Sequence, residues 1–282
     1  MDGLEGKVAL VTGSTRGIGE ATARLLAAAG ARVVITGRNA ERGRAVAESI
    51  AGEGGQALYT PLDAGDHDSV ARAIEVAVDG FGALDILVNN AAPTDVMASQ
   101  TGRLTEIPWD EFEHVMRVGL YGAVWACRYG IPHMQRAGGG AIVNISSLAA
   151  VSGLPGLTAY TCAKGGLCAL TRQLALDYAR DGIRVNTVIV GAIINELTEA
   201  MMSVPGMPES LARMHLTRLG RNDDVARAVA YFAGDAAGFL TGTELRVDGG
   251  SSSVGPLPTE VVESGLGADR VVVPAGAAAD TN

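Results

Sequence analysis

Short apolar runs that alternate with longer amphipathic stretches are the feature that most constrains the fold of this chain. Residues 8–11 form the first run, and residues 18–29 form the first amphipathic stretch, with one apolar stripe. The same alternation predicts further strands at 33–35, 57–59, 86–88, 141–145, 185–189 and 244–247, and helices at 40–51, 67–80, 109–136, 158–180 and 223–233. It predicts an α/β fold, a doubly wound parallel sheet of about seven strands with helices on both faces and ligands at the carboxyl ends of the strands.

Length and composition set the domain organisation. The chain has 282 residues, and single α/β domains can reach ~250 residues. Apolar residues make up 48% and charged residues 19%, a balance typical of a folded globular protein. Composition shifts to Ser, Gly, Pro and Ala after Gly250. We therefore expect one domain over 1–250 and a C-terminal tail over 251–282, either mobile or laid over a neighbouring subunit.

The charge balance and the cysteines limit the partners. A net charge of −9 disfavours nucleic acid and anionic membranes, because polyanions bind basic faces. No apolar run approaches the ~20 residues of a membrane span, and the acidic start is unlike a signal peptide. The cysteines and histidines lack metal-ligand spacing. We expect a cytoplasmic protein without a metal, a nucleic-acid partner or a membrane partner.

A glycine-rich turn joins the first strand to the first helix and predicts a dinucleotide site. Gly13 allows a tight turn, Gly17 lets the backbone approach a phosphate, and Gly19 lets the helix pack on the strand. The helix N-terminus would then present N–H groups to a pyrophosphate. The predicted cofactor loop consists of Gly13, Ser14, Thr15, Arg16, Gly17, Ile18 and Gly19. The alternative is a purely structural turn.

The end of the second strand indicates which dinucleotide is used. Enzymes that use NAD usually carry an acid there, which binds the ribose 2′-hydroxyl. Here Gly37 takes that place, Arg38 follows, and Arg16 in the first loop can reach the same spot. Two guanidinium groups without a carboxylate suit a 2′-phosphate, so the pattern favours NADP(H) over NAD(H). The alternative is two solvated surface arginines.

A tyrosine and a lysine four residues apart provide candidate chemistry. Tyr160 and Lys164 would lie one turn apart on one helix face, where the ammonium should lower the pKa of the phenol. Such a tyrosine can act as a general acid or base. Ser147 follows the strand at 141–145 and can hydrogen-bond a substrate carbonyl. The Tyr-x-x-x-Lys spacing alone is more often a helix surface pair.

Taken together, these motifs make the chain resemble the short-chain dehydrogenases/reductases, a family with a Rossmann fold and an NADP(H) or NAD(H) cofactor. The resemblance covers about residues 4–250 and is strongest to bacterial 3-oxoacyl carrier-protein reductases and related ketoreductases. It rests on Thr12-Gly13-x-x-x-Gly17-x-Gly19, Asp63, Asn89-Asn90-Ala91, Ser147, Tyr160-x-x-x-Lys164, Leu219-Gly220-Arg221, Leu240-Thr241-Gly242 and Val247-Asp248-Gly249-Gly250.

The resemblance implies roles for residues around the cofactor. Asp63 and Ala64 would contact the adenine, and Asn90 would line the cofactor cleft. Lys164 would hold the nicotinamide ribose, and Ile193 would contact the carboxamide through its backbone.

The resemblance also implies the chemistry and the assembly. Tyr160 would be the acid in reduction, and Ser147 would polarise the carbonyl. The helices at 109–136 and 158–180 would form a homo-oligomer, a tetramer or a dimer.

Three departures from the family pattern bear on activity. Gly119 stands where the family usually has an asparagine that supports proton relay, Val190-Gly191 replaces Pro-Gly, and Asn195 replaces a threonine. Residues 192–216 fall where the family keeps a mobile substrate loop. Their apolar residues suit a hydrophobic ketone or alcohol, although they can equally pack within the protein: Ile193, Ile194, Leu197, Met201, Met202, Met207, Leu211 and Met214.

Three functions are consistent with these features. The leading hypothesis is an NADP(H)-dependent oxidoreductase that interconverts a carbonyl and a secondary alcohol of a hydrophobic small molecule. A second is a ketoreductase for a carrier-bound acyl thioester, which would dock on Arg117, Arg128 and Arg136, although these arginines can equally be solvated. A third, motivated by Gly119, is a catalytically silent NADP-binding sensor or scaffold.

Overall fold

A single parallel sheet organises the computed structural model, which describes residues 2–93, 102–196 and 198–253. Seven strands pair in the order β3-β2-β1-β4-β5-β6-β9, and all six pairings are parallel. The strands are β1 (Val8–Val11), β2 (Arg32–Gly37), β3 (Gln56–Pro61), β4 (Ile86–Asn89), β5 (Gly140–Ser147), β6 (Ile183–Val190) and β9 (Glu244–Val247). The predicted doubly wound fold is confirmed. The strand order reverses between β1 and β4, where such sheets open a crevice.

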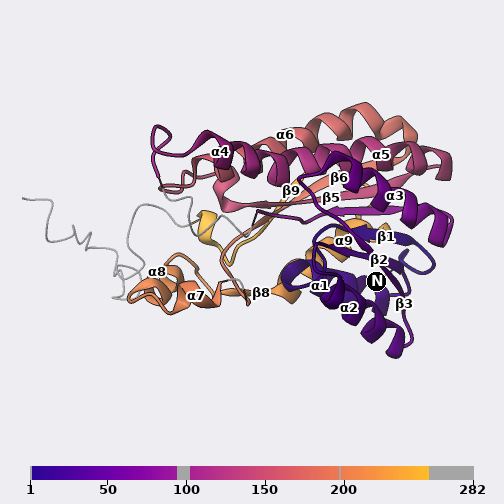
Figure 1. Ribbon diagram of the computed structural model, residues 1–282, viewed down its shortest axis with the longest axis horizontal. Helices are drawn as coiled ribbons and strands as arrows, with labels where there is room; N and C mark the ends of the chain where they lie inside the picture. Colours follow the sequence, from indigo (N-terminus) through magenta and orange to yellow (C-terminus); the bar gives the residue numbers. More distant parts are fainter. Residues whose placement is uncertain (1, 94–101, 197, 254–282) are drawn as a thin grey trace, which may run out of the picture.

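Helices cover both faces of the sheet. Figure 1 shows α1 (Gly17–Ala28), α2 (Ala40–Gly52) and α9 (Asn222–Ala233) on one side. On the other side lie α3 (His67–Phe81), α4 (Trp109–Met116), α5 (Gly122–Ala137) and α6 (Thr158–Tyr178). Two buried aliphatic clusters, one under each layer, form the core. No helix in the described ranges is long and apolar enough to cross a bilayer.

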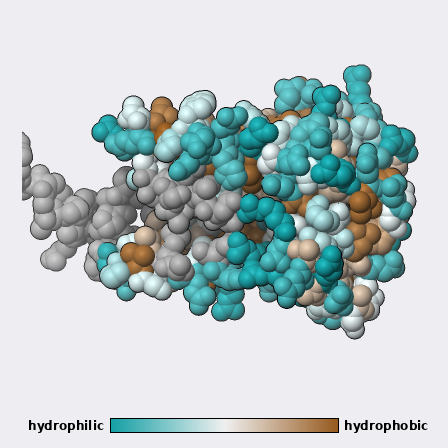
Figure 2. Space-filling view, viewed as in Figure 1, coloured by the Kyte–Doolittle hydropathy of each residue, from teal (hydrophilic) through white to brown (hydrophobic). Residues whose placement is uncertain are grey.

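Short elements that the sequence pattern did not predict follow β6. They are β7 (Ile193–Ile194), α7 (Glu199–Met202), α8 (Met207–Arg213) and β8 (Gly220–Arg221), with β7 paired parallel to β8. Each is too short to show a periodic pattern. Figure 1 shows α7 and α8 at one end of the molecule, beyond the carboxyl ends of β5 and β6. The face in Figure 2 is mainly hydrophilic, but hydrophobic atoms reach the surface near α8. Met214 and Leu216, which follow α8, are exposed.

The long helix predicted over 109–136 is interrupted, which corrects the prediction of one continuous helix. Residues Arg117–Tyr121 form a single π-helical turn, η1, between α4 and α5. Two glycines let this region pack tightly. A Cβ on Gly122 would lie 2.5 Å from the carbonyl oxygen of Ala64, and one on Gly119 would lie 3.1 Å from the Cβ of Ala163. The helix therefore changes its winding where its backbone meets its neighbours, as π-turns often do near functional sites.

The folded region extends slightly past the predicted boundary at residue 250. Ser251–Ser253 form a short 3-10 turn, η5, and the amide of Ser252 donates to the Asp248 carboxylate at 2.9 Å. The rest of the predicted tail lies outside the described residues, so its character stays a prediction. Three further 3-10 turns are η2 (Leu148–Ala150), η3 (Ala179–Asp181) and η4 (Asp235–Ala237).

The crowding at Gly122 predicts opposite effects for one substitution made at two helical positions. Gly122→Ala drives a methyl group into backbone, which should lower the free energy of unfolding by about 1–3 kcal/mol. A Cβ on Gly165 in α6 meets nothing within 4 Å, so Gly165→Ala should raise stability by up to about 1 kcal/mol. Urea unfolding of both variants checks this, and equal effects would contradict the packing described at η1.

Candidate active site

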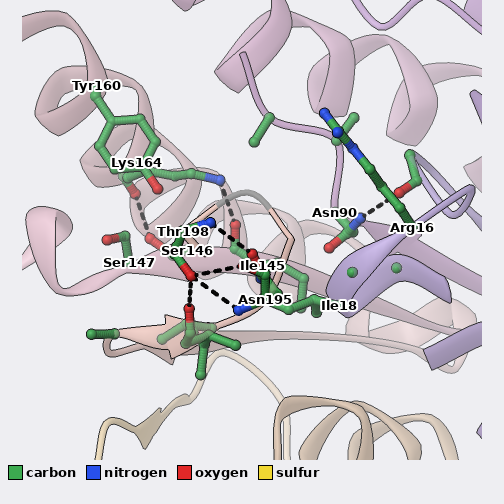
Figure 3. Close-up of a pocket in the computed structure, with 18 of the residues that line it drawn as sticks. Arg16, Ile18, Asn90, Ile145, Ser146, Ser147, Tyr160, Lys164, Asn195 and Thr198 are labelled. Carbon is green, nitrogen blue, oxygen red and sulfur yellow. Dashed lines mark hydrogen bonds between the residues drawn. The ribbon is translucent and has the colours of Figure 1, made fainter. Parts of the chain in front are cut away.

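A cavity of about 1050 Å³ lies at the carboxyl ends of the central strands. It brings together residues from β1, β4, β5, β6 and α6 that are far apart in the sequence. Figure 3 shows Arg16 and Asn90 on one side of it and Tyr160 and Lys164 on the other. Of the predicted site residues, it is lined by Gly13, Thr15, Arg16, Gly17, Ile18, Gly19, Arg38, Asp63, Ala64, Asn90, Ser147, Tyr160, Lys164 and Ile193.

The glycine loop has the geometry of an anion cradle. Gly17 adopts a φ of +62°, which side chains rarely tolerate, and starts α1 with no side-chain cap on its N–H groups. A Cβ on Gly19 would lie 2.4 Å from the carbonyl oxygen of Gly13, so only glycine allows this approach. Uncapped N–H groups at the positive end of a helix dipole suit a pyrophosphate, and the residues present fit that group.

Asn90 and Ser14 both brace this loop, but only one of them faces the cavity. The Asn90 side-chain amide donates to the carbonyl oxygens of Thr12 at 2.9 Å and Gly13 at 3.0 Å. Ser14 is fully buried beneath the loop, where its Oγ donates to Val11 and accepts from the amide of Thr36. The Ser14 hydroxyl therefore holds β1 to β2, and the place of Ser14 in the cofactor loop stays a prediction.

The end of the cavity beside β2 is lined by guanidinium groups, and Gly37, the last residue of β2, is crowded by Thr15. A Cβ on Gly37 would lie 2.7 Å from the methyl carbon of Thr15, so an aspartate there would displace that side chain. Arg16 and Arg38 both line the cavity, as does Arg42, which the sequence analysis missed. Arg42 pairs with Glu196 at 3.2 Å. Guanidinium groups suit a 2′-phosphate, so these residues fit an NADP adenosine.

Burial dominates the electrostatics of the candidate catalytic residues. Lys164 is 2% exposed, and its Nζ donates to the carbonyl oxygen of Ile145 at 2.8 Å. Loss of hydration lowers the pKa of Lys164 from 10.5 to about 8. The same Nζ lies 5.7 Å from the ring centroid of Tyr160. The lysine is thus held under the tyrosine ring by a backbone acceptor.

The predicted lowering of the tyrosine pKa is wrong for the protein without a cofactor. Burial raises the pKa of Tyr160, and a hydrogen bond with Ser147 acts in the opposite direction without overcoming it. The lysine charge is directed at Ile145 rather than at the phenol oxygen. Tyr160 is therefore a neutral phenol here, and Ser147 is close enough to act on its pKa.

The segment after β6 forms a compact hydrogen-bonded turn. The Thr198 hydroxyl donates to the carbonyl oxygen of Ile193 at 2.7 Å, and the Thr198 amide donates to the Asn195 side chain at 3.2 Å (Figure 3). Asn195 also donates to Asn222 at 3.3 Å. Asn195 therefore anchors this turn to α9. Thr198 was missed, although the Asn-x-x-Thr spacing is typical of such turns.

The opposite end of the cavity is apolar. Its side chains come from the segment after β5 and from the α7–α8 segment, which we call the lid (residues 198–216). They include Leu148, Leu154, Leu157, Met202, Met207, Leu211 and Met214. Among the described residues that line the cavity, the arginines come from the first two strand–helix units, at the other end. The one lysine among them, Lys164, comes from α6. Leu197 and the side chain of Met201 lie outside the described residues.

Comparison with known proteins agrees with this geometry. A family model described as "Enoyl-(Acyl carrier protein) reductase" matches residues 13–252. Cis-4-hydroxycyclohexanecarboxylate dehydrogenase of Sinomonas cyclohexanicum is 41% identical over 253 residues, which cover 88% of this chain and 97% of that protein. The 7alpha-hydroxysteroid dehydrogenase of Clostridium sardiniense is 37% identical over 250 residues, covering 89% and 95%.

A solved structure is similar over the same region. A gluconate 5-dehydrogenase from Burkholderia cenocepacia, in complex with NADP and tartrate, superimposes with a TM-score of 0.84 and 34% identity. The match covers 90% of this chain and 98% of that one. The fold, the site and these relatives define an oxidoreductase of the nicotinamide-dependent class. The chain belongs to the short-chain dehydrogenase/reductase family, as its motifs indicated.

The buried lysine predicts a specific pH dependence of stability. The pKa of Lys164 is about 8 in the folded protein and near 10.5 when exposed, so the unfolded chain holds the proton more tightly. The penalty for burying the charge is complete below about pH 8 and disappears as pH rises toward 10.5. The stability of the parent relative to Lys164→Met should therefore rise by on the order of 3 kcal/mol across that window.

Urea unfolding of both proteins at several pH values checks this prediction. Taking the difference between parent and variant removes the titration of every other group. A difference that stays flat between about pH 8 and 10.5 would contradict a buried lysine with a lowered pKa.

Proposed function

We propose that the protein is an NADP(H)-dependent dehydrogenase/reductase that interconverts a secondary alcohol and a ketone of a hydrophobic, uncharged small molecule. One observation carries the proposal. A single cavity holds the glycine loop and Arg38 at one end and Ser147, Tyr160 and Lys164 at the other. Its volume of about 1050 Å³ lies at the upper end of the range typical of small-molecule and cofactor sites.

The protein side chains supply binding, orientation and a proton. A bound nicotinamide would supply hydride transfer between cofactor and substrate carbon. Ser147 and Tyr160 both line the cavity, and Ser147 opposes the rise in the pKa of Tyr160, so we expect both hydroxyls to contact the substrate oxygen. Tyr160 takes the hydroxyl proton during oxidation and gives one back during reduction. Lys164, 5.7 Å from the ring centroid, favours the deprotonated phenol whenever it carries its charge.

The apolar lid supports an uncharged substrate. Methionine and leucine side chains adapt to an apolar ring and offer nothing to a carboxylate. The two relatives above are named for substrates that carry a hydroxyl group on a ring. A carbocyclic secondary alcohol is therefore the substrate class that we infer. A soluble homo-oligomer acting in the cytoplasm, with a tetramer or dimer as its form, remains part of the proposal.

The two other hypotheses receive less support. Two of the three arginines suggested as a carrier-protein dock already have partners: Arg117 lies over the Trp125 ring at 5.8 Å, and Arg136 contacts His133 at 2.7 Å. The silent-scaffold hypothesis rests on Gly119 alone. A scaffold has no need for a buried lysine beneath a tyrosine that is hydrogen-bonded to a serine.

A substrate panel tests the proposal. Purified protein with NADP⁺ is offered cyclohexanol, a carboxylated cyclohexanol, gluconate and a 3-hydroxyacyl thioester, and reduced cofactor is measured by absorbance. We expect the uncharged cyclic alcohol to have the highest kcat/KM. Tyr160→Phe should abolish turnover and still bind NADPH, whereas Tyr178→Phe, elsewhere on α6, should leave turnover intact. A preference for gluconate or the thioester would overturn the substrate class.

Cofactor choice is tested at Arg38. Arg38→Ala removes a guanidinium from the adenine end, and losing one charge-assisted hydrogen bond corresponds to roughly a tenfold to hundredfold rise in the KM for NADP(H). The KM for NAD(H), which lacks the 2′-phosphate, should hardly change. Arg44→Ala serves as the matched control, because Arg44 is on α2 and is not part of the cavity lining. Equal losses with both cofactors would refute the assignment.

A further inference from the structure

His215 is a buried imidazole that the proposed chemistry does not use. It follows α8, is 7% exposed and lines the cavity together with its neighbour Met214. The sequence alone gave it no role, because it lacks the spacing of a metal ligand. In the structure it lies where the lid meets the strand β6 and the turn after β9.

Two backbone groups hold the imidazole by its two ring nitrogens. Its Nε2 accepts a hydrogen bond from the Ala192 amide at 3.1 Å, and its Nδ1 lies 2.7 Å from the carbonyl oxygen of Leu211. An amide can only donate and a carbonyl can only accept, which assigns Nδ1 as the donor and Nε2 as the acceptor. The ring thus bridges the lid at Leu211 and the β6–β7 connection at Ala192.

The ring occupies a slot made by two glycines. A Cβ on Gly191 would lie 3.0 Å from His215 Nε2, and one on Gly249 would lie 3.3 Å from its Cδ2. The nearby carboxylate of Asp248 is occupied by the amides of Gly250 and Ser252. The packing therefore directs the ring at the backbone rather than at an acid. Gly191, the glycine of the Val190-Gly191 pair, leaves the space for it.

Ala192 is the point at which the lid and the reactive end of the cavity meet. Its carbonyl oxygen accepts from the Gly220 amide at 2.9 Å, which pairs β7 with β8, while its amide is held by His215. The next residue, Ile193, lines the cavity beside the catalytic residues. On the lid side, Leu211 and Met214 flank His215 and also line the cavity.

We propose that His215 is a positioning residue that anchors the substrate lid to the Ala192 backbone and so sets the lid's distance from the catalytic residues. The proposal rests on the proposed function, since it assigns the lid to substrate binding. An anchored lid is ordered before substrate arrives, so less conformational entropy is lost on binding. Removing the anchor should weaken substrate binding more than it slows the chemical step.

Three substitutions distinguish the hydrogen bond between His215 and Ala192 from the hydrogen bond between His215 and Leu211 within the lid. His215→Gln has a side chain long enough to offer its amide oxygen to the Ala192 N–H. His215→Asn is shorter, so it keeps a donor near Leu211 and does not reach Ala192. His215→Leu retains apolar bulk and removes both bonds. We expect only the glutamine variant to restore the hydrogen bond from the Ala192 amide.

The experiment has one readout that needs no substrate and one that does. Hydrogen exchange of the Ala192 amide in the full-length protein should quicken at least tenfold in the leucine and asparagine variants and stay near the parent rate in His215→Gln. With the best alcohol from the panel, the KM should rise about tenfold in those two variants, as the loss of one hydrogen bond allows, while kcat changes less than threefold. Thermal unfolding confirms that all three variants fold.

Several results would overturn the proposal. Unchanged exchange at Ala192 in His215→Leu would show that no anchor exists. Equal rescue of Ala192 exchange by asparagine and glutamine would show that the ring bonds only within the lid. A loss of kcat with unchanged KM would show that His215 does not act through substrate binding. If the parent turns over no alcohol, the proposed function fails while the exchange measurement still decides whether the anchor is present.

Discussion

The close approach of the first helix to the first strand is the constraint on which the site depends. Gly19 brings α1 so near Gly13 that a single methyl group would collide with its carbonyl oxygen at 2.4 Å. Asn90, from the end of β4, holds the same loop through two backbone carbonyls. The helix dipole is thereby aimed into the crevice between β1 and β4, and the position of the catalytic residues follows from the order of the remaining strands.

Charge divides the cavity into two ends with separate tasks. Guanidinium groups gather at the end formed by the first two strand–helix units, and aliphatic and thioether side chains at the end formed by the lid. Between them Lys164 is buried at a cost in stability, seen in the lowering of its pKa to about 8. A buried apolar residue at this position would stabilise the fold, so the presence of a lysine here indicates a functional role.

Much of the fold and the site could be predicted because repeating patterns and fixed spacings carry them. The alternation of apolar runs predicted the seven strands, and the Tyr160–Lys164 spacing predicted one shared helix face. Other features depend on contacts between distant residues. The π-turn at Gly119 packs against Ala163, and the buried Ser14 hydroxyl accepts a hydrogen bond from Thr36. The raised pKa of Tyr160 results from burial, which the residue spacing cannot reveal. The contacts of His215 and Thr198 depend on elements too short to show a periodic pattern.

The most direct measurement follows the hydrogen that the reaction moves. A secondary alcohol labelled with deuterium on the carbon that carries the hydroxyl is incubated with the enzyme and NADP⁺, and the reduced cofactor is analysed by mass spectrometry. We expect each reduced cofactor to carry one deuterium, and Tyr160→Phe to yield no reduced cofactor. Deuterium released to water, or reduced cofactor without the label, would contradict direct transfer within this cavity.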